Sequence, residues 1–162
     1  DIFLFSFYTR GMSFIDMAYL KKSDLKNGTI TYRRRKTGQQ LTVKWEKCME
    51  DIIAKYGENT ATRYLLPIIT NPCSDERTQY RNAICRINVA LKEVAGLAGL
   101  NIPLTMHVAR HCWASVAKSK NIPLSVISEG MGHDSEETTR IYLASLDTSV
   151  VDKANSLILK DF

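Results

Sequence analysis

The stretch EGMGHDSEETTRIYLASL, residues 129–146, contains two side chains on which the interpretation of this chain depends. A Gly-His pair ending at His133 is typical of a tight turn. Asp134 or Ser135 can cap the helix that the next residues predict, and Tyr142 lies in that helix, nine residues after the histidine. This stretch alone permits two interpretations, an ordinary turn and helix or part of an active site.

The rest of the pattern predicts a mainly α fold with a small antiparallel β-hairpin, an α+β domain. Apolar residues at a spacing of three and four predict helices, and alternation around a Lys-Thr-Gly turn predicts a hairpin. Residues 2–20 are expected to form a helix or a helix pair broken near Gly11. The predicted strands are 29–33 and 40–44, and further helices are predicted at 45–56, 75–95, 106–119, 123–129, through Tyr142, and at 147–159.

Composition excludes several classes of protein. A chain of 162 residues with 44% hydrophobic residues is long enough for one globular domain. No apolar run approaches the ~20 residues that a membrane span needs, and no signal peptide is visible, so we expect a cytoplasmic protein. The four cysteines are scattered without a CxxC pair, which argues against a zinc ribbon.

Positive charge is concentrated in one segment. Residues 21–47 contain nine Lys and Arg against two acids, a net charge of +7 in a chain whose total is +5. Such a cluster is typical of a protein that binds a polyanion, most often nucleic acid, although a solvated basic face has the same charge. The residues expected to contact DNA are Lys21, Lys22, Arg33, Arg34 and Arg35.

The predicted helix at 106–119 carries histidines and an arginine in its first turns. His107 and Arg110 are three residues apart and share a helix face, and His111 is four residues from His107. The HExxH zinc motif needs a glutamate where Val108 stands, and no further ligand completes a set, so we expect no metal.

Taken together, HVARHCWAS (107–115), MGH (131–133) and TTRIY (138–142) occur in the order and spacing of a known family. Each motif alone is weak, but together with the basic hairpin RRRKTGQ (33–39) they are specific. The chain resembles the catalytic domain of the tyrosine recombinases, also called the phage integrase family. The resemblance covers essentially the whole chain and implies that family's DNA breaking-rejoining fold.

The resemblance implies a role for five residues. Tyr142 would be the nucleophile that attacks a DNA phosphodiester, and Arg110 would grip the phosphate. His107 and His133 would hydrogen-bond its non-bridging oxygens and assist proton movement, and Lys36 would be the general acid that protonates the leaving 5′ oxygen. Cationic donors of this kind suit a transition state that spreads negative charge over phosphate oxygens.

The resemblance also implies partners and domain organisation. The enzyme would form a covalent 3′-phosphotyrosine on double-stranded DNA without metal or cofactor. It would act as a homotetramer, with the C-terminal helix either capping its own domain or docking on a neighbour. Residues 1–162 would form the catalytic domain, without its first helix and the N-terminal core-binding domain of a mobile-element integrase.

One position departs from the family pattern. In TRGMSFIDMAYL (9–20), alignment on Gly11 places Ser13 where the family has its first catalytic arginine. A conjugative-transposon branch similarly has serine there and is active, so we expect an active enzyme. Two explanations remain open: one of Arg10, Arg33, Arg34 and Arg35 supplies the charge, or Ser13 donates a hydrogen bond in a slower enzyme.

Two alternatives to a recombinase follow from the same residues. A relaxing enzyme similar to the type IB topoisomerases would share the tyrosine chemistry. The loss of the arginine at Ser13 would instead fit a basic DNA-binding module without catalysis. The target DNA sequence, and the choice between integration, excision, inversion and resolution, are not encoded in these motifs.

Overall fold

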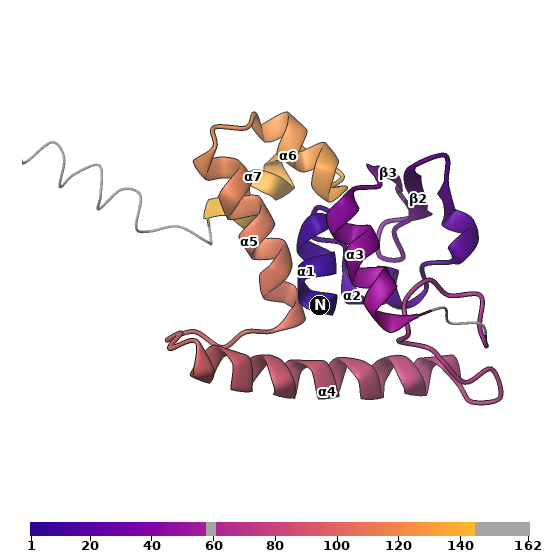
Figure 1. Cartoon of the computed structure of the whole chain (residues 1–162). Coiled ribbons are helices and arrows are strands. Elements are labelled where there is room, and N and C mark those ends of the chain that lie inside the picture. Colours follow the sequence, from indigo (N-terminus) through magenta and orange to yellow (C-terminus); the bar gives the residue numbers. More distant parts are fainter. Residues whose placement is uncertain (58–60, 145–162) are drawn as a thin grey trace, which may run out of the picture. The chain divides into compact units, whose positions relative to one another are not determined.

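The computed structural model describes residues 1–57 and 61–144 (Figure 1). The chain divides into two compact units, residues 1–113 and 114–162, and the second is described as far as Ala144. The described part is mainly helical with one three-stranded antiparallel sheet, which confirms the predicted fold class. The helix predicted at 147–159 lies outside the described residues.

The N-terminal segment forms two short helices, α1 (Ile2–Tyr8) and α2 (Phe14–Ala18). The chain turns between them through Arg10 and Gly11, whose φ angles are 61° and 74°. Both angles lie in the left-handed region, which a glycine adopts without steric cost. The predicted helix pair is therefore confirmed, with its break at Gly11.

The sheet contains the predicted hairpin and one additional strand. Strands β2 (Thr29–Arg33) and β3 (Gln40–Lys44) have the predicted bounds, and Tyr32 pairs with Leu41. A 3-10 turn, η1 (Lys22–Asp24), leads into the short strand β1 (Leu25–Lys26), which pairs with β2. The two-residue Asn-Gly loop between β1 and β2 is a strong hairpin signal, but a two-residue strand has too little alternation to detect from sequence.

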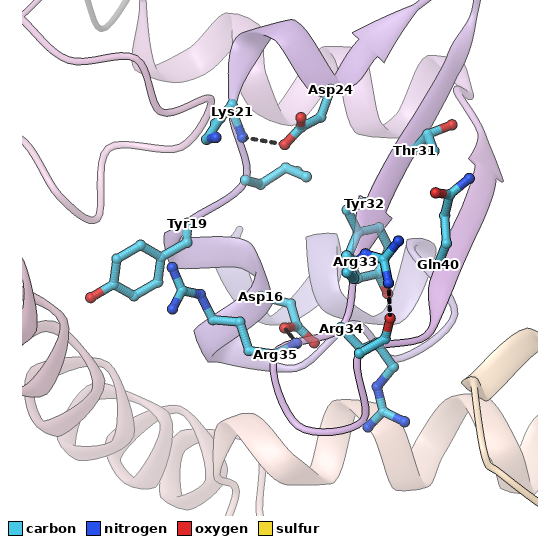
Figure 2. Close-up of a pocket in the computed structure, with 12 residues that line it drawn as sticks. Asp16, Tyr19, Lys21, Asp24, Thr31, Tyr32, Arg33, Arg34, Arg35 and Gln40 are labelled. Carbon is cyan, nitrogen blue, oxygen red and sulfur yellow. Dashed lines mark hydrogen bonds between the residues drawn. The ribbon is translucent and has the colours of Figure 1, made fainter.

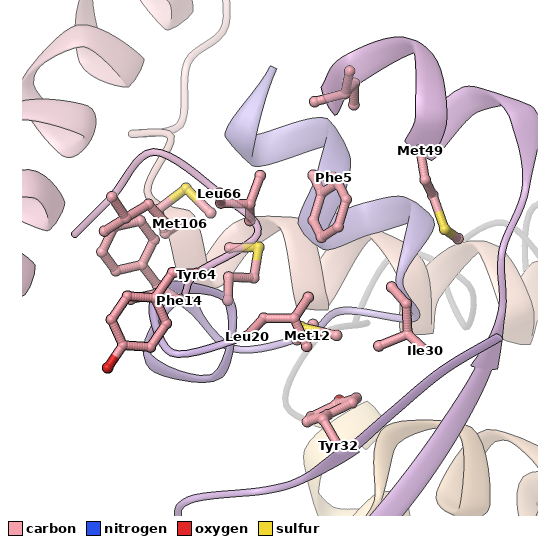
Figure 3. Packing of buried hydrophobic residues seen from close by; sticks show 14 of the residues in the cluster. Phe5, Met12, Phe14, Leu20, Ile30, Tyr32, Met49, Tyr64, Leu66 and Met106 are labelled. Atoms are coloured by element: carbon pink, nitrogen blue, oxygen red, sulfur yellow. The ribbon is translucent and has the colours of Figure 1, made fainter. Parts of the chain in front are cut away.

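The core of the first unit lies between these elements and two longer helices (Figure 3). Helix α3 (Lys47–Tyr56) packs against α1, and α4 (Glu76–Leu97) packs against α2. Phe5 and Leu66 are fully buried, and the Phe14 and Tyr80 rings lie 5.6 Å apart between centroids. This packing holds α2 and the hairpin in fixed positions.

Helix α5 (Met106–Ser119) begins in the first unit and ends in the second, with the predicted bounds. In the second unit, α6 (Leu124–Met131) packs against α7 (Glu136–Ala144). Ile127, Met131 and Leu143 are buried there. None of the helices in the described ranges is long and apolar enough to cross a membrane.

Candidate active site

The first turns of α5 place Arg110 against the bend between α1 and α2. Its Nη1 donates a hydrogen bond of 2.8 Å to the carbonyl oxygen of Gly11, and the side chain is only 7% exposed. A Cβ atom at Gly11 would lie 2.8 Å from Cγ of Arg110, which is too close for any other residue without a shift. Glycine is therefore required at this bend both by its φ angle and by the approach of α5.

Ser13, His107 and Arg110 line the same cavity of about 160 Å³ in the first unit. Ser13 is the N-cap of α2, and its hydroxyl donates to Oδ2 of Asp16 at 2.5 Å. The resemblance implied that all three positions act at the phosphate, and their roles remain predictions. Ser13 contributes a neutral hydroxyl there, and that hydroxyl is bonded to a carboxylate.

The two histidines of α5 contact each other in an edge-to-face arrangement, with 4.4 Å between ring centroids. Burial, followed by the nearby charges of Arg110 and Lys36, lowers the pKa of His107. Burial also lowers the pKa of His111, together with His107 and Arg110. The environment therefore favours neutral imidazoles on this face of α5 at pH 7.

The turn between β2 and β3 is closed by backbone hydrogen bonds and presents Lys36 to solvent. Arg34 donates its N–H to Gln39 and accepts from Gly38, both at 2.8 Å. Lys36 is exposed. Because its charge acts on His107, the turn brings this lysine into the electrostatic neighbourhood of α5.

The three consecutive arginines of the hairpin point to different environments (Figure 2). Arg33 is exposed and donates to the Gly38 carbonyl at 3.0 Å. Arg35 is also exposed, and its guanidinium lies 3.6 Å from the Tyr19 ring centroid. The backbone N–H of Arg35 donates to Oδ1 of Asp16 at 2.9 Å. Arg34 is only 7% exposed, although it lines the same groove as Arg33 and Arg35, and its predicted contact with DNA remains a prediction.

The phenol of Tyr32 lies within the electrostatic influence of Arg34 and Arg110. Burial raises the pKa of its phenol well above the usual value, and the charge of Asp16 also raises it. The charges of Arg110, Arg34 and Arg10 act in the opposite direction. Two buried guanidinium groups, from α5 and from the hairpin, therefore act on the same phenol. We call Ser13, Arg34, Lys36, His107 and Arg110 the first cluster.

The second unit places His133 at the end of α6. Gly132 adopts the left-handed conformation, with φ 64° and ψ 46°. The N–H of Gly132 donates to Glu129, and that of His133 donates to Ser128, both at 3.0 Å. This pair of bonds is a Schellman motif, which ends α6 and fixes the backbone at His133.

His133, Thr139 and Tyr142 form what we call the second cluster. Nδ1 of His133 and Oγ1 of Thr139 are joined by a hydrogen bond of 2.8 Å, and Thr139 is fully buried. The rings of His133 and Tyr142 are edge to face, with 5.6 Å between centroids. Ser135 accepts from the N–H of Thr138 at 3.2 Å, so of the two predicted caps, Asp134 and Ser135, the serine caps α7.

Sequence reasoning did not assign Tyr32 or Thr139 to the site. Tyr32 lies on the inward face of β2, where an aromatic residue looks like ordinary core. The alternation Ile30, Tyr32, Arg34 did carry a signal, because a period of two continues the buried face into the arginine. Thr139 is part of the TTRIY motif, but nothing in its spacing shows which of the two threonines faces the histidine.

A larger groove of about 540 Å³ lies beside the hairpin, and Lys21, Arg33 and Arg35 are among its lining residues (Figure 2). Lys22, also predicted to contact DNA, lies in η1 and is half-buried. Among residues 1–57 and 61–144, no three His, Cys, Asp or Glu side chains gather as metal ligands would.

The fold and the motifs that form these two clusters can be compared with known proteins. The family model described as "Phage integrase family" matches residues 3–149. The chain therefore belongs to the phage integrase family, the tyrosine recombinases, as its motifs predicted. No curated protein matches the chain.

Solved structures of recombinases share the fold. XerA recombinase is 21% identical, with a TM-score of 0.68 over 96% of this chain and 56% of that one. XerH site-specific recombinase in a post-cleavage complex with a palindromic difH substrate is 19% identical, with a TM-score of 0.65 over 96% of this chain and 44% of that one. A lambda integrase dimer bound to a COC′ core site is 17% identical, with a TM-score of 0.59 over 88% of this chain and 50% of that one. The chain spans about half the length of these proteins.

Proposed function

We propose that this chain is the catalytic domain of a site-specific DNA recombinase that uses Tyr142 as its nucleophile. The observation that carries the proposal is the grouping of Ser13, His107 and Arg110 around one cavity in a member of the phage integrase family. In the similar structures XerH is bound to a palindromic difH substrate and lambda integrase to a COC′ core site, which supports double-stranded DNA as the substrate.

In the proposed reaction, the Tyr142 oxygen forms a bond to phosphorus as the bond from phosphorus to the 5′ oxygen breaks. The products are a 3′-phosphotyrosine and a 5′ hydroxyl, whose proton comes from Lys36. Because the phosphotyrosine preserves a phosphoester bond, a second 5′ hydroxyl can reverse the step and rejoin the strands without ATP. Arg110 and His107 bind the non-bridging oxygens, where negative charge develops in the transition state.

Arg34 supplies the positive charge that Ser13 lacks. Among the candidate arginines, Arg33 and Arg35 are exposed and contact the Gly38 carbonyl and the Tyr19 ring. Arg34 is buried, whereas Arg10 is only half-buried. A guanidinium held in place in a region of low dielectric stabilises a phosphate more than one that must be ordered from solvent.

The remaining parts of the proposal concern assembly. A DNA clamp would need an N-terminal core-binding domain, and a homotetramer would bring four catalytic domains to two duplexes. Exchange of the predicted 147–159 helix between protomers would couple their activities, and those residues lie outside the described ranges. Each part can be tested by sedimentation of the full-length protein on DNA.

The nucleophile is tested with a pool of nicked duplexes that carry a randomised core. Cleavage beside the nick releases a short oligonucleotide that diffuses away, so the covalent adduct accumulates and survives denaturant. We expect an adduct with the wild type and with Tyr56→Phe, an exposed tyrosine on α3, and none with Tyr142→Phe. An adduct with Tyr142→Phe would refute the assignment.

The same pool separates the alternative functions. Sequencing of the trapped strands is expected to show a preferred core site. A broad spread of sequences, with rapid relaxation of supercoiled plasmid, would favour the topoisomerase-like enzyme. A shift of the DNA in a native gel without any covalent adduct would favour a DNA-binding module.

A further inference from the structure

Thr139 is the buried partner of the histidine in the second cluster. Its side chain has no exposed surface, and its hydroxyl oxygen lies 2.8 Å from Nδ1 of His133. The neighbouring Thr138 is exposed, and its hydroxyl bonds to Ser135 at the helix cap. The two adjacent threonines of α7 thus have different surroundings and different partners.

The direction of the bond between Thr139 and His133 follows from the number of partners available to the hydroxyl. Among the described residues, the Thr139 hydroxyl has a hydrogen bond to Nδ1 and to no other atom. A hydroxyl proton in a buried position needs an acceptor, and an unprotonated Nδ1 is such an acceptor. If Nδ1 carried the proton instead, the threonine oxygen would accept and its own proton would have no acceptor. The O–H group therefore donates to Nδ1.

We infer that Thr139 is a positioning residue that holds His133 as the neutral tautomer with its proton on Nε2. The hydrogen bond made by one imidazole nitrogen decides which nitrogen carries the proton. With Nδ1 occupied as an acceptor, Nε2–H remains as a donor. The Schellman motif fixes the backbone of His133 and Thr139 fixes its ring, so the direction of that donor is also fixed.

This inference rests on the proposed function and specifies the role of His133 in it. An Nε2 that already carries a proton cannot accept the one that Tyr142 loses, so His133 serves as a hydrogen-bond donor to a non-bridging phosphate oxygen. The edge-to-face contact between its ring and Tyr142 keeps the donor near the nucleophile. The proton that Tyr142 loses on attack therefore passes to solvent water.

The tautomer can be measured without catalysis by NMR of full-length protein labelled with ¹⁵N in its histidines. At neutral pH we expect His133 to show a protonated Nε2 and an unprotonated, hydrogen-bonded Nδ1. In Thr139→Val, which keeps the shape of the side chain, the Nδ1 signal should move to the position of a free acceptor, and in Thr139→Ser it should not. A protonated Nδ1 in the wild type would overturn the inference.

Cleavage rates test whether the positioning matters for the reaction. We expect Thr139→Val to slow adduct formation about tenfold to a hundredfold, similar to the loss when the hydrogen-bond partner of a metal-binding histidine is removed. Thr139→Ser should restore most of the rate, and the matched control Thr138→Val should leave the rate unchanged. In a His133→Ala background, Thr139→Val should have no further effect, because the two residues act as one unit.

The outcomes separate the two proposals. Equal slowing by Thr139→Val with and without His133 would show a merely structural role and overturn the inference. A wild type that forms no adduct would refute the proposed function, while the NMR measurement would still decide the tautomer.

Discussion

In the first cluster Arg110 is held by the carbonyl of Gly11, 99 residues away in sequence, whereas in the second His133 is held by Thr139, six residues away. The first cluster requires α2, the hairpin and α5 to be packed before any of its side chains is in place. The second requires only a helix end, a turn and the first turns of α7. A perturbation of the packing should therefore affect the first cluster more than the second.

The largest effect in the first cluster is expected from Lys36→Ala. Loss of a general acid should slow cleavage of an ordinary strand about 10²–10⁴-fold. A substrate with a 5′-thiol leaving group needs no proton and should be cleaved at close to the wild-type rate. Measured single-turnover rates on both substrates test the role, and equal slowing on both would refute it.

Arg34→Ala is expected to slow adduct formation about 10²–10³-fold, as removal of a preorganised donor to a developing negative charge does. Arg33→Ala is the matched control, because this neighbour is exposed and should mainly weaken DNA binding. The double variant Ser13→Arg with Arg34→Ala should recover part of the rate, since it places a guanidinium at the cavity that Ser13 lines. If Arg33→Ala slows cleavage of bound DNA as much as Arg34→Ala does, the choice of Arg34 is wrong.

Gly11→Ala tests the long-range contact of the first cluster through stability. The added Cβ would meet Cγ of Arg110 at 2.8 Å in a residue with φ 74°. We expect a loss of about 2–4 kcal/mol in the free energy of unfolding, from left-handed strain and overpacking. Gly28→Ala has a similar φ, 71°, with nothing within 4 Å of its Cβ, and should cost about 1–2 kcal/mol from strain alone. Denaturant unfolding of both variants gives the difference, and equal losses would show that α5 can move away from the bend.

The smallest effect is expected in the pKa of His107 when Lys36 is replaced by alanine. The positive charge of Lys36 contributes to lowering the pKa of this histidine, after burial and Arg110. Lys36→Ala should therefore raise the pKa of His107, and NMR titration of the imidazole signals measures it. Lys44→Ala is the control, because that exposed lysine pairs with Glu46 at 3.2 Å and should leave the midpoint unchanged. An unchanged midpoint in Lys36→Ala would show that the turn does not bring this charge to α5.

The candidate site was predictable from sequence where the contacts are local. The Gly-His turn, the cap at Ser135 and the helix with Tyr142 all depend on residues a few positions apart, and the structure has them. Helix α5 and strands β2 and β3 also have the predicted bounds, because their apolar periodicity is regular. The roles of the site residues remain predictions.

The sequence by itself determined the family and the order of the longer helices and strands, because each depends on residue types at fixed spacing. Only the tertiary structure decided which of the consecutive arginines is buried, that the Gly11 carbonyl holds Arg110, and which threonine faces His133. The physical reason is that burial and hydrogen-bond partners depend on which elements pack together. Residues adjacent in sequence can then lie in opposite environments, as Arg33 and Arg34 do.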